Sequence, residues 1–189
     1  LIYQPAIKSY MMGEAPPAFD LLFWNGDGTN LPARMSVEYL RGLCQRDEFA
    51  QGGFTILGHK VHLSDVKVPL AAIACETDHI AAWKGSFNGI RQMGSKDKTF
   101  IMSQSGHIAG IINPPSKGKY GHYVNEGPMT TPEEWLAGAT FHKSSWWPMW
   151  GEWLAKRSGR QIAARTPGDS DHPVLAPAPG TYVKAVPAA

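Results

Sequence analysis

Two short apolar runs separated by an amphipathic segment constrain the fold of this chain more than any other feature. Residues 66–75 are almost continuously apolar, which is typical of a strand covered on both faces of a parallel sheet. Trp83, Phe87 and Ile90 then recur at helical spacing, and residues 99–103 indicate a second buried strand. Such a βαβ unit has parallel, adjacent strands, because its crossover is right-handed in nearly every case. The chain is therefore predicted to be an α/β protein.

The residues before this unit predict a helix and a hairpin. Thr29 and Asn30 precede Pro32, a combination typical of a capped helix start, and apolar residues recur at helical spacing up to residue 46. Further along, apolar residues 54–57 and 61–63 flank a turn at residues 58–60. This pattern indicates a β-hairpin.

Two further helices are expected after the unit. Thr131 and Glu134 have the spacing of a capping box, with Pro132 at the first helical position. Four tryptophans between Trp146 and Trp153 lie at helical spacing, which suits a helix buried against the core or an aromatic face for a membrane or a polymer granule. We favour the buried helix, because the segment has no basic stripe that would face lipid. From residue 158 onward, Pro, Gly, Ala and polar residues predict a tail.

Composition excludes several classes of protein. The chain has 189 residues, of which 43% are hydrophobic and 18% charged, and this balance argues against disorder. A formal net charge of +2 gives no reason to expect a nucleic-acid interface. No apolar run reaches the ~18 residues that a membrane span needs. Two cysteines without paired spacing, and histidines without ligand spacing, predict no disulfide framework and no metal site and fit a reducing compartment.

Two titratable side chains lie just beyond the carboxyl ends of the predicted parallel strands. Asp78 follows the first strand and His107 follows the second. Functional groups collect at this edge of a parallel sheet, and neighbouring strands are only ~5 Å apart. We therefore predict that Asp78 and His107 meet as catalytic residues. The structural alternatives are a loop histidine that satisfies backbone groups and an aspartate that caps the helix ahead of Ala81.

A hydrolase-type triad on this fold also requires a nucleophile ahead of the acid. The sequence contains no G-x-S-x-G or G-x-C-x-G elbow. Cys44 belongs to a helical pattern and Cys75 lies within the first strand, so both are interpreted as small buried residues. An acid and a base are thus present, and a nucleophile is not.

Five motifs in the same order resemble the C-terminal half of the poly(3-hydroxyalkanoate) synthases. They are WNGDGTNLP, ETDHIAAW, SGHIAGIINPP, TPEEWLAGAT and SSWWPMWGEWL, which lie between Trp24 and Leu154. The resemblance runs from about residue 19 to residue 183, and TNLP and SGHIAG look more like the class I enzymes, which favour short-chain 3-hydroxyacyl-CoA.

The resemblance implies the C-terminal portion of an α/β-hydrolase fold, with parallel strands and a crossover helix, plus part of a cap region. Residues 1–63 are then expected to be a cap-associated segment and residues 64–157 the C-terminal part of the catalytic core. Residues 158–189 are expected to be a C-terminal tail.

The resemblance also implies a polymerising acyltransferase that joins 3-hydroxyacyl-CoA units, with 3-hydroxybutyryl-CoA the expected one, into polyhydroxyalkanoate and releases CoA. The family's catalytic aspartate and histidine match Asp78 and His107, and its nucleophilic cysteine is expected upstream of Leu1. Asp78 either orients the imidazole or itself takes the proton of the incoming hydroxyl. Lys117 and Lys119 either contact the CoA phosphates or are simply solvated.

No cofactor is expected, because CoA is part of the substrate. The implied partners are a polyhydroxyalkanoate granule and a second copy of the full-length enzyme, and the implied location is the cytoplasm at the granule surface. Two other functions stay open: part of an esterase or depolymerase, and a non-catalytic module that binds granules or a partner. The isolated chain is expected to be inactive and marginally stable.

Overall fold

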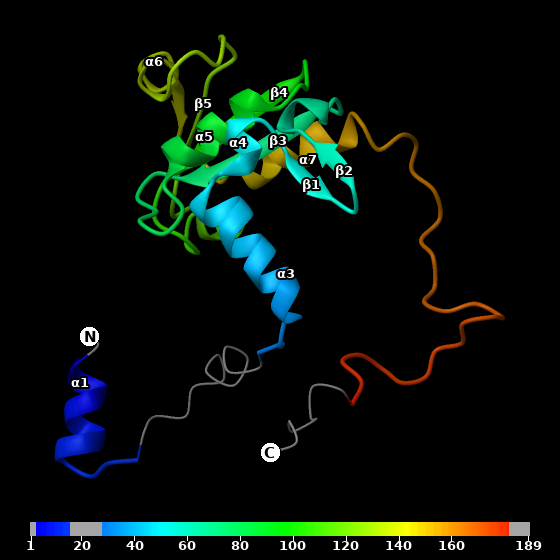
Figure 1. Ribbon diagram of the computed structural model, residues 1–189. Coiled ribbons are helices and arrows are strands. Elements are labelled where there is room, and N and C mark those ends of the chain that lie inside the picture. Colours follow the sequence, from blue (N-terminus) through cyan, green and yellow to red (C-terminus); the bar gives the residue numbers. More distant parts are fainter. Residues whose placement is uncertain (1–2, 16–27, 182–189) are drawn as a thin grey trace.

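A four-stranded mixed sheet organises the chain. The computed structural model describes residues 3–15 and 28–181. The sheet has the order β3-β4-β5-β6, and Figure 1 shows it in the green and yellow part of the chain. Its strands are β3 (Leu70–Cys75), β4 (Lys98–Ser103), β5 (His122–Val124) and β6 (Thr140–His142).

The predicted βαβ unit is confirmed. β3 and β4 are parallel neighbours, with Cys75 opposite Ser103 at their carboxyl ends. Helix α5 (Trp83–Gln92) connects them and packs on both strands. The apolar runs predicted these strands because side chains on both of their faces are at least partly covered.

Strands β5 and β6 have no counterpart among the sequence predictions. β5 pairs antiparallel with β4, and β6 pairs antiparallel with β5, so the sheet contains one parallel pair rather than only parallel strands. Each has three residues, too few for a visible alternation of apolar and polar side chains. Their pairing depends on Gly121, because a Cβ there would collide with the ring of Phe141 and the carbonyl of His142.

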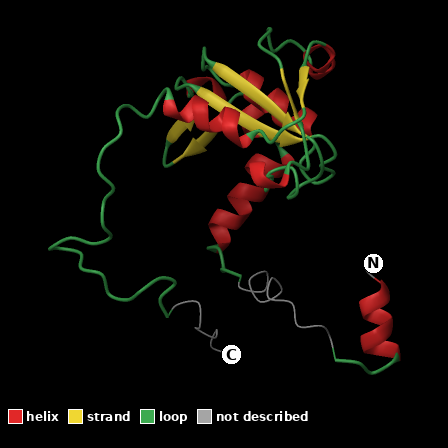
Figure 2. Cartoon of the chain, turned by 180° about the vertical axis from the view of Figure 1, so that it is seen from behind, coloured by secondary structure: helices red, strands yellow, loops and turns green. Residues whose placement is uncertain are grey.

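Alternation along β3 and β4 separates two faces of the sheet. One face presents Phe100, which packs edge-to-face against Phe87 of α5, with ring centroids 5.2 Å apart. Trp135 completes this cluster from α6 (Pro132–Ala137), 5.1 Å from the Phe100 ring. The other face presents Ser103, toward α7 (Trp147–Ala155), and Figures 1 and 2 show α5 and α7 on opposite sides of the sheet.

The two C-terminal helix predictions are confirmed. The side chain of Thr131 caps α6 by accepting a hydrogen bond from the Glu134 backbone N–H at 3.2 Å, as the capping-box spacing predicts. The tryptophan-rich segment forms α7, which begins at Trp147. Its expected burial is only partial, because no residue within α7 is buried and Trp150 is 39% exposed, whereas Trp146 at the N-cap is 6% exposed. Beyond it, residues 160–181 contain no helix or strand and are almost entirely exposed.

The helix predicted before the sheet is present, but its capping prediction was wrong. It comprises α3 (Ala33–Glu38) and a π-helical continuation, η2 (Tyr39–Gln45). Pro32 is the N-cap, and no side chain caps the first turn. The apolar face of this helix is exposed, with Met35 and Tyr39 53% and 51% accessible.

The predicted hairpin is confirmed with a tighter turn. It pairs β1 (Phe54–Ile56) with β2 (His59–Val61), so His59 and Lys60 lie in a strand and not in the turn. Leu57 and Gly58 form the turn, with φ of 48° and 81°, the two positive values of a type I′ connection. The remaining short elements, which had not been predicted, are α1 (Tyr3–Ala6), η1 (Ile7–Met11), α4 (Glu48–Gln51), η3 (Leu63–Asp65) and η4 (Pro115–Lys117).

None of the helices in the described ranges combines the length and the apolar character needed to cross a bilayer.

The aromatic cluster should dominate the stability of the chain. Phe87 is fully buried, so replacing it with Ala should lower the free energy of unfolding by about 3–5 kcal/mol. The matched control is Tyr10→Ala, because Tyr10 is 92% exposed and its loss should change stability by less than about 0.5 kcal/mol. Urea unfolding followed by circular dichroism measures both, and equal effects would contradict the assignment of the core.

Candidate active site

Asp78 and His107 are in direct contact at the carboxyl edge of the parallel pair. The Nδ1 atom of His107 lies 2.8 Å from Oδ2 of Asp78. Asp78 belongs to the loop between β3 and α5, and His107 to the loop that follows β4. Backbone hydrogen bonds continue the strand pairing into these loops, from Glu76 N to Ser103 O at 2.8 Å and from Thr77 N to Ser105 O at 3.1 Å. The meeting of the two side chains therefore follows from the register of β3 and β4.

The carboxylate of Asp78 is fixed by its own loop as well as by His107. Its Oδ1 atom accepts hydrogen bonds from the backbone N–H groups of Ile80 and Ala81, both at 2.9 Å. The bond from Ala81, followed by that from His107, lowers the pKa of Asp78 from 3.8 to about 2. Asp78 therefore also makes the turn that the structural alternative expected, although α5 itself begins later, with Ala82 as its N-cap.

The two members of the pair differ in access to solvent. The Asp78 side chain is 7% exposed, whereas that of His107 is 47% exposed. An ionised carboxylate accepts hydrogen bonds only, so Nδ1 of His107 carries the proton of their bond. Within the described residues, Nε2 of His107 makes no hydrogen bond, and in this tautomer its lone pair can accept a proton.

The loop before His107 has an unusual backbone conformation. Ser105 has a φ of 76°, in the left-handed region that residues other than Gly adopt uncommonly. Its carbonyl is held by Thr77, and the adjacent Gln104 pairs with Gly121 through both its backbone N–H and its side-chain Oε1. Strained backbone of this kind tends to occur at functional sites, where the surroundings hold it in place.

Among the described residues, neither cysteine makes a hydrogen bond to the Asp78–His107 pair. Cys75 is 2% exposed, and burial, followed by the charge of Asp78, raises the pKa of its thiol. A Cβ at Gly110 would collide with the Cys75 sulfur, so this thiol packs closely against the His107 loop. Cys44 is exposed on η2, which corrects its interpretation as a buried residue.

The two candidate CoA contacts, Lys117 and Lys119, are exposed in the loop between β4 and β5. The ammonium group of Lys119 lies 5.0 Å from the centre of the Tyr120 ring. Hydrogen bonding with Lys119, and then with Ser105, lowers the pKa of Tyr120.

The other sequence candidates contribute no contact to this pair. His79 is exposed and makes no side-chain hydrogen bond among the described residues. Trp24, Asn25 and Asp27 of the WNGDGTNLP motif lie outside the described residues. Over residues 3–15 and 28–181, no group of three or more His, Cys, Asp and Glu side chains could hold a metal ion.

No sequence pattern indicated the donors that hold the His107 loop. Trp146 Nε1 donates to Gly110 O at 3.0 Å, and Trp147 Nε1 donates to Ile111 O at 2.9 Å. The helical spacing of the tryptophans predicted packing for these side chains. The same spacing gave no indication that their N–H groups bond to a loop more than thirty residues earlier in the chain.

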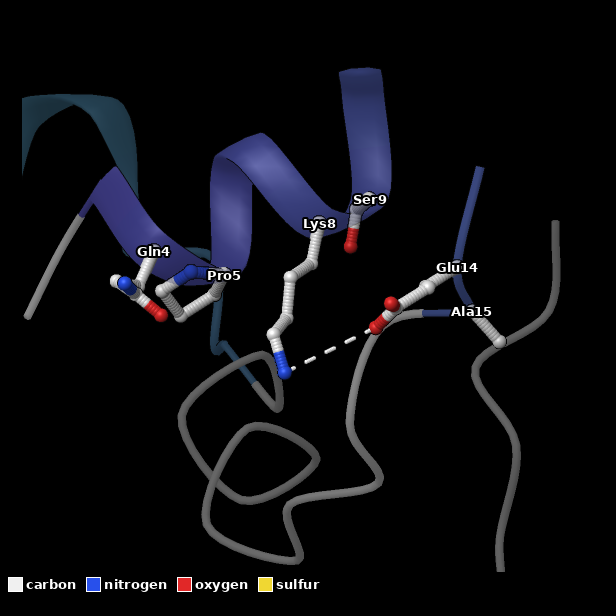
Figure 3. A pocket seen from close by; sticks show the side chains of 6 residues that line it. All are labelled: Gln4, Pro5, Lys8, Ser9, Glu14 and Ala15. Atoms are coloured by element: carbon white, nitrogen blue, oxygen red, sulfur yellow. Dashed lines mark ion pairs between the residues drawn. The ribbon is translucent and has the colours of Figure 1, made fainter. Parts of the chain in front are cut away.

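Several pockets lie away from the pair. One, of about 290 Å³, is formed by the N-terminal helix and the turn after it, where Lys8 and Glu14 form an ion pair at 4.0 Å (Figure 3). Another, of about 410 Å³, lies between α3, η2 and the hairpin and includes Met35 and Phe54 in its lining. Neither is lined by Asp78 or His107, so neither is a substrate site for this pair.

Known proteins with similar sequences are poly(3-hydroxyalkanoate) polymerases. The chain is 40% identical over 187 residues to the polymerase subunit PhaC of Cupriavidus necator, covering 98% of this chain and 32% of the relative. It is 40% identical to the polymerase of Methylorubrum extorquens, over 97% of this chain and 30% of that protein. It is 33% identical to polymerase 1 of Ectopseudomonas oleovorans, over 97% of this chain and 33% of that protein. The chain thus spans about a third of the length of these relatives, and no family model matches it.

The hydrogen bonds to Asp78 predict its titration. Its pKa is lower in the folded than in the unfolded chain, so its contribution to stability is present above about pH 4 and is lost as the pH falls toward about 2. Because the bond from Ala81 is the larger cause, His107→Ala should raise the pKa of Asp78 but leave it below 3.8.

Carboxyl carbon NMR titration of the folded chain measures this pKa directly. Asp171, on the exposed C-terminal tail, is the internal reference carboxylate. A pKa of Asp78 at or above 3.8 in the unsubstituted chain would contradict the geometry described for its loop.

Proposed function

This chain is a homologue of the C-terminal portion of class I poly(3-hydroxyalkanoate) polymerases, and from that premise we propose that it supplies the acid and the base of their acyl-transfer site. The observation that carries the proposal is the 2.8 Å contact between His107 Nδ1 and Asp78 Oδ2. The proposed reaction joins 3-hydroxyacyl-CoA units, with 3-hydroxybutyryl-CoA the expected substrate, into a polyester and releases CoA.

His107 is the proposed general base. Its ring is half exposed, and in the tautomer that Asp78 favours, Nε2 is free to take a proton. It would first take the proton of a cysteine thiol, whose sulfur attacks the thioester carbonyl while the CoA thiolate leaves and is protonated. It would then take the proton of the hydroxyl of the next unit, whose oxygen forms the new ester bond and displaces the cysteine sulfur. General bases typically contribute ~10² to 10⁴ in rate.

Asp78 is proposed to orient His107 rather than to deprotonate the substrate. Both of its oxygens accept hydrogen bonds, and its side chain is only 7% exposed. A carboxylate with a pKa of about 2 is a weak base near neutral pH. These features favour the orienting role of Asp78 over the alternative that Asp78 takes the proton of the substrate hydroxyl.

The nucleophile is proposed to come from outside this chain. Burial and a raised pKa keep the Cys75 thiol protonated, and Cys44 lies on the helix that precedes the sheet. An esterase or depolymerase would use the same Asp–His pair with a serine nucleophile. The similarity to polymerases favours the acyltransferase.

We extend the proposal to the organisation of the chain. Residues 64–157, which hold the sheet with α5, α6 and α7, are the proposed C-terminal part of an α/β-hydrolase core. Residues 1–63 are the proposed cap-associated segment, and residues 158–189 the tail. The proposed setting of the whole enzyme is a homodimer in the cytoplasm, at the surface of a polymer granule.

Substitution of the pair in a complete enzyme tests the proposed roles. A chimera that carries this chain in place of the homologous third of the Cupriavidus necator polymerase supplies the rest of the protein. His107→Gln should lower polymer formation by roughly 10² or more, and Asp78→Asn should lower it through misorientation of the ring. His79→Gln is the matched control, because His79 is exposed in the same loop region.

The assay measures CoA release and polymer formation from 3-hydroxybutyryl-CoA. An active His107→Gln chimera would refute the proposed base, and CoA release without polymer would favour the hydrolase.

The chain on its own should be inactive. Incubation of the purified 189-residue chain with 3-hydroxybutyryl-CoA should release no CoA, since neither cysteine is set up to attack. Turnover that disappears on Cys75→Ala or Cys44→Ala would overturn both this expectation and the assignment of the nucleophile. Co-sedimentation with polymer granules separately tests the non-catalytic binding function.

A further inference from the structure

His107 lies in a short turn that is held by hydrogen bonds within its own backbone. Gly110 N donates to Gly106 O at 3.1 Å, and Ile112 N donates to Ile108 O at 2.9 Å. These bonds form a single helix-like turn around His107. At the end of this turn Ile111 O accepts a local bond from Asn113 N at 3.0 Å, whereas Gly110 O has no backbone donor within the described residues. Both carbonyls can accept further donors from elsewhere.

Side chains from the start of α7 supply these donors. Gly110 O accepts from both Ser103 Oγ at 2.8 Å and Trp146 Nε1 at 3.0 Å. Ile111 O accepts from Trp147 Nε1 at 2.9 Å. Ser145 donates to Asn113 O through its hydroxyl. Consecutive residues 145–147 therefore hold the end of the turn on the face of the sheet opposite α5.

We propose that Trp146 and Trp147 are positioning residues for His107, acting through the hydrogen bonds of their indole N–H groups to the Gly110 and Ile111 carbonyls. The inference goes beyond the proposed function, on which it rests, by naming residues that set the geometry of the base. It also assigns a role to the SSWW part of the C-terminal motif, for which the sequence suggested only packing or polymer contact.

The comparison with the other tryptophans supports a specific role. The Nε1 atoms of Trp135 and Trp153 are buried without a hydrogen-bond partner in the described part of the chain. Aromatic packing alone therefore leaves indole N–H groups unpaired in this protein. At Trp146 and Trp147 the N–H groups reach carbonyls only three and four residues beyond His107.

The indole hydrogen bonds restrict the backbone of the turn, and through it the position of the His107 side chain. Gly110 packs closely against the end of the sheet, because a Cβ there would lie only 2.6 Å from the Cys75 sulfur and 2.7 Å from the Gln104 carbonyl oxygen. The indole of Trp146 also packs against Gly110, because its N–H group donates to the Gly110 carbonyl. Trp146 itself is buried, with 6% of its surface exposed.

Loss of the Trp146 donor would leave Gly110 O with Ser103 Oγ alone, and loss of the Trp147 donor would leave Ile111 O with Asn113 N alone. Either loss would remove the link to residues 146–147 and free the turn to move, together with the imidazole.

The test compares three Trp→Phe variants of the full 189-residue chain. Trp147→Phe and Trp146→Phe each remove a bonded N–H group, whereas Trp153→Phe removes one that has no partner and is the matched control. The readout is the pKa of Asp78 from carboxyl carbon NMR, because contact with His107 contributes to lowering it. Trp147→Phe and Trp146→Phe should move this pKa toward the value found with His107→Ala, and Trp153→Phe should leave it unchanged.

Kinetics of the chimera give the second readout. Trp147→Phe should lower kcat by roughly 10- to 100-fold with KM nearly unchanged, as expected for a misplaced base, and Trp153→Phe should have no such effect. Circular dichroism verifies folding. If both substitutions at residues 146 and 147 unfold the chain, Ser103→Ala, which removes the other donor to Gly110 O, provides the same comparison.

The outcomes separate this inference from the proposed function. An unchanged Asp78 pKa and an unchanged kcat in folded Trp147→Phe would overturn the positioning role, while leaving the catalytic pair intact. A His107→Gln chimera that stays active would instead overturn the proposed function, and the pKa comparison would still report on the position of His107.

Discussion

Parallel pairing of β3 with β4 is the constraint on which the site depends. With Cys75 opposite Ser103, the two strands end level, and two backbone hydrogen bonds carry the pairing into the loops that follow. The loops that carry Asp78 and His107 therefore leave the sheet side by side, and the two side chains meet at 2.8 Å. The aromatic cluster of Phe87, Phe100 and Trp135 holds α5 against the same strands, so the core that stabilises the chain also fixes the edge at which its chemistry would occur.

The two groups of the pair are made different by their surroundings. Backbone N–H groups from residues 80 and 81 keep the carboxylate of Asp78 ionised and shielded, which makes it a fixed acceptor. His107 keeps one nitrogen for that acceptor and leaves the other toward the accessible side. The loop that carries it is held from the opposite face of the sheet by α7. His107 thus stays accessible to solvent, while hydrogen bonds from Trp146 and Trp147 to the backbone of its loop hold it in place.

The parts of this structure that sequence could predict are those set by local pattern. Continuous apolar runs indicated β3 and β4, and the spacing of Thr131 and Glu134 indicated the cap of α6. The strands β5 and β6 were missed because they depend on a long-range fit between Gly121 and Phe141, to which three-residue segments give no local clue. The donors from Trp146 and Trp147 were missed for the same reason. The cap expected from Thr29 and Asn30 failed because Pro32 occupies the N-cap position, and its side chain has no atom that could accept a hydrogen bond. Topology brought Asp78 and His107 together, so their contact could be anticipated from strand order. The place of Asp78 just ahead of Ala81 likewise indicated a capping role, which its bonds from the Ile80 and Ala81 N–H groups fulfil.

The most direct test of the account is the tautomer of His107, read from the nitrogen chemical shifts of its ring by NMR at a pH where the imidazole is neutral. The account requires the proton on Nδ1, facing Asp78, with Nε2 unprotonated. It also requires that this preference be lost when Asp78 is replaced by Ala. A ring protonated on Nε2, or one whose shifts are indifferent to Asp78→Ala, would contradict it.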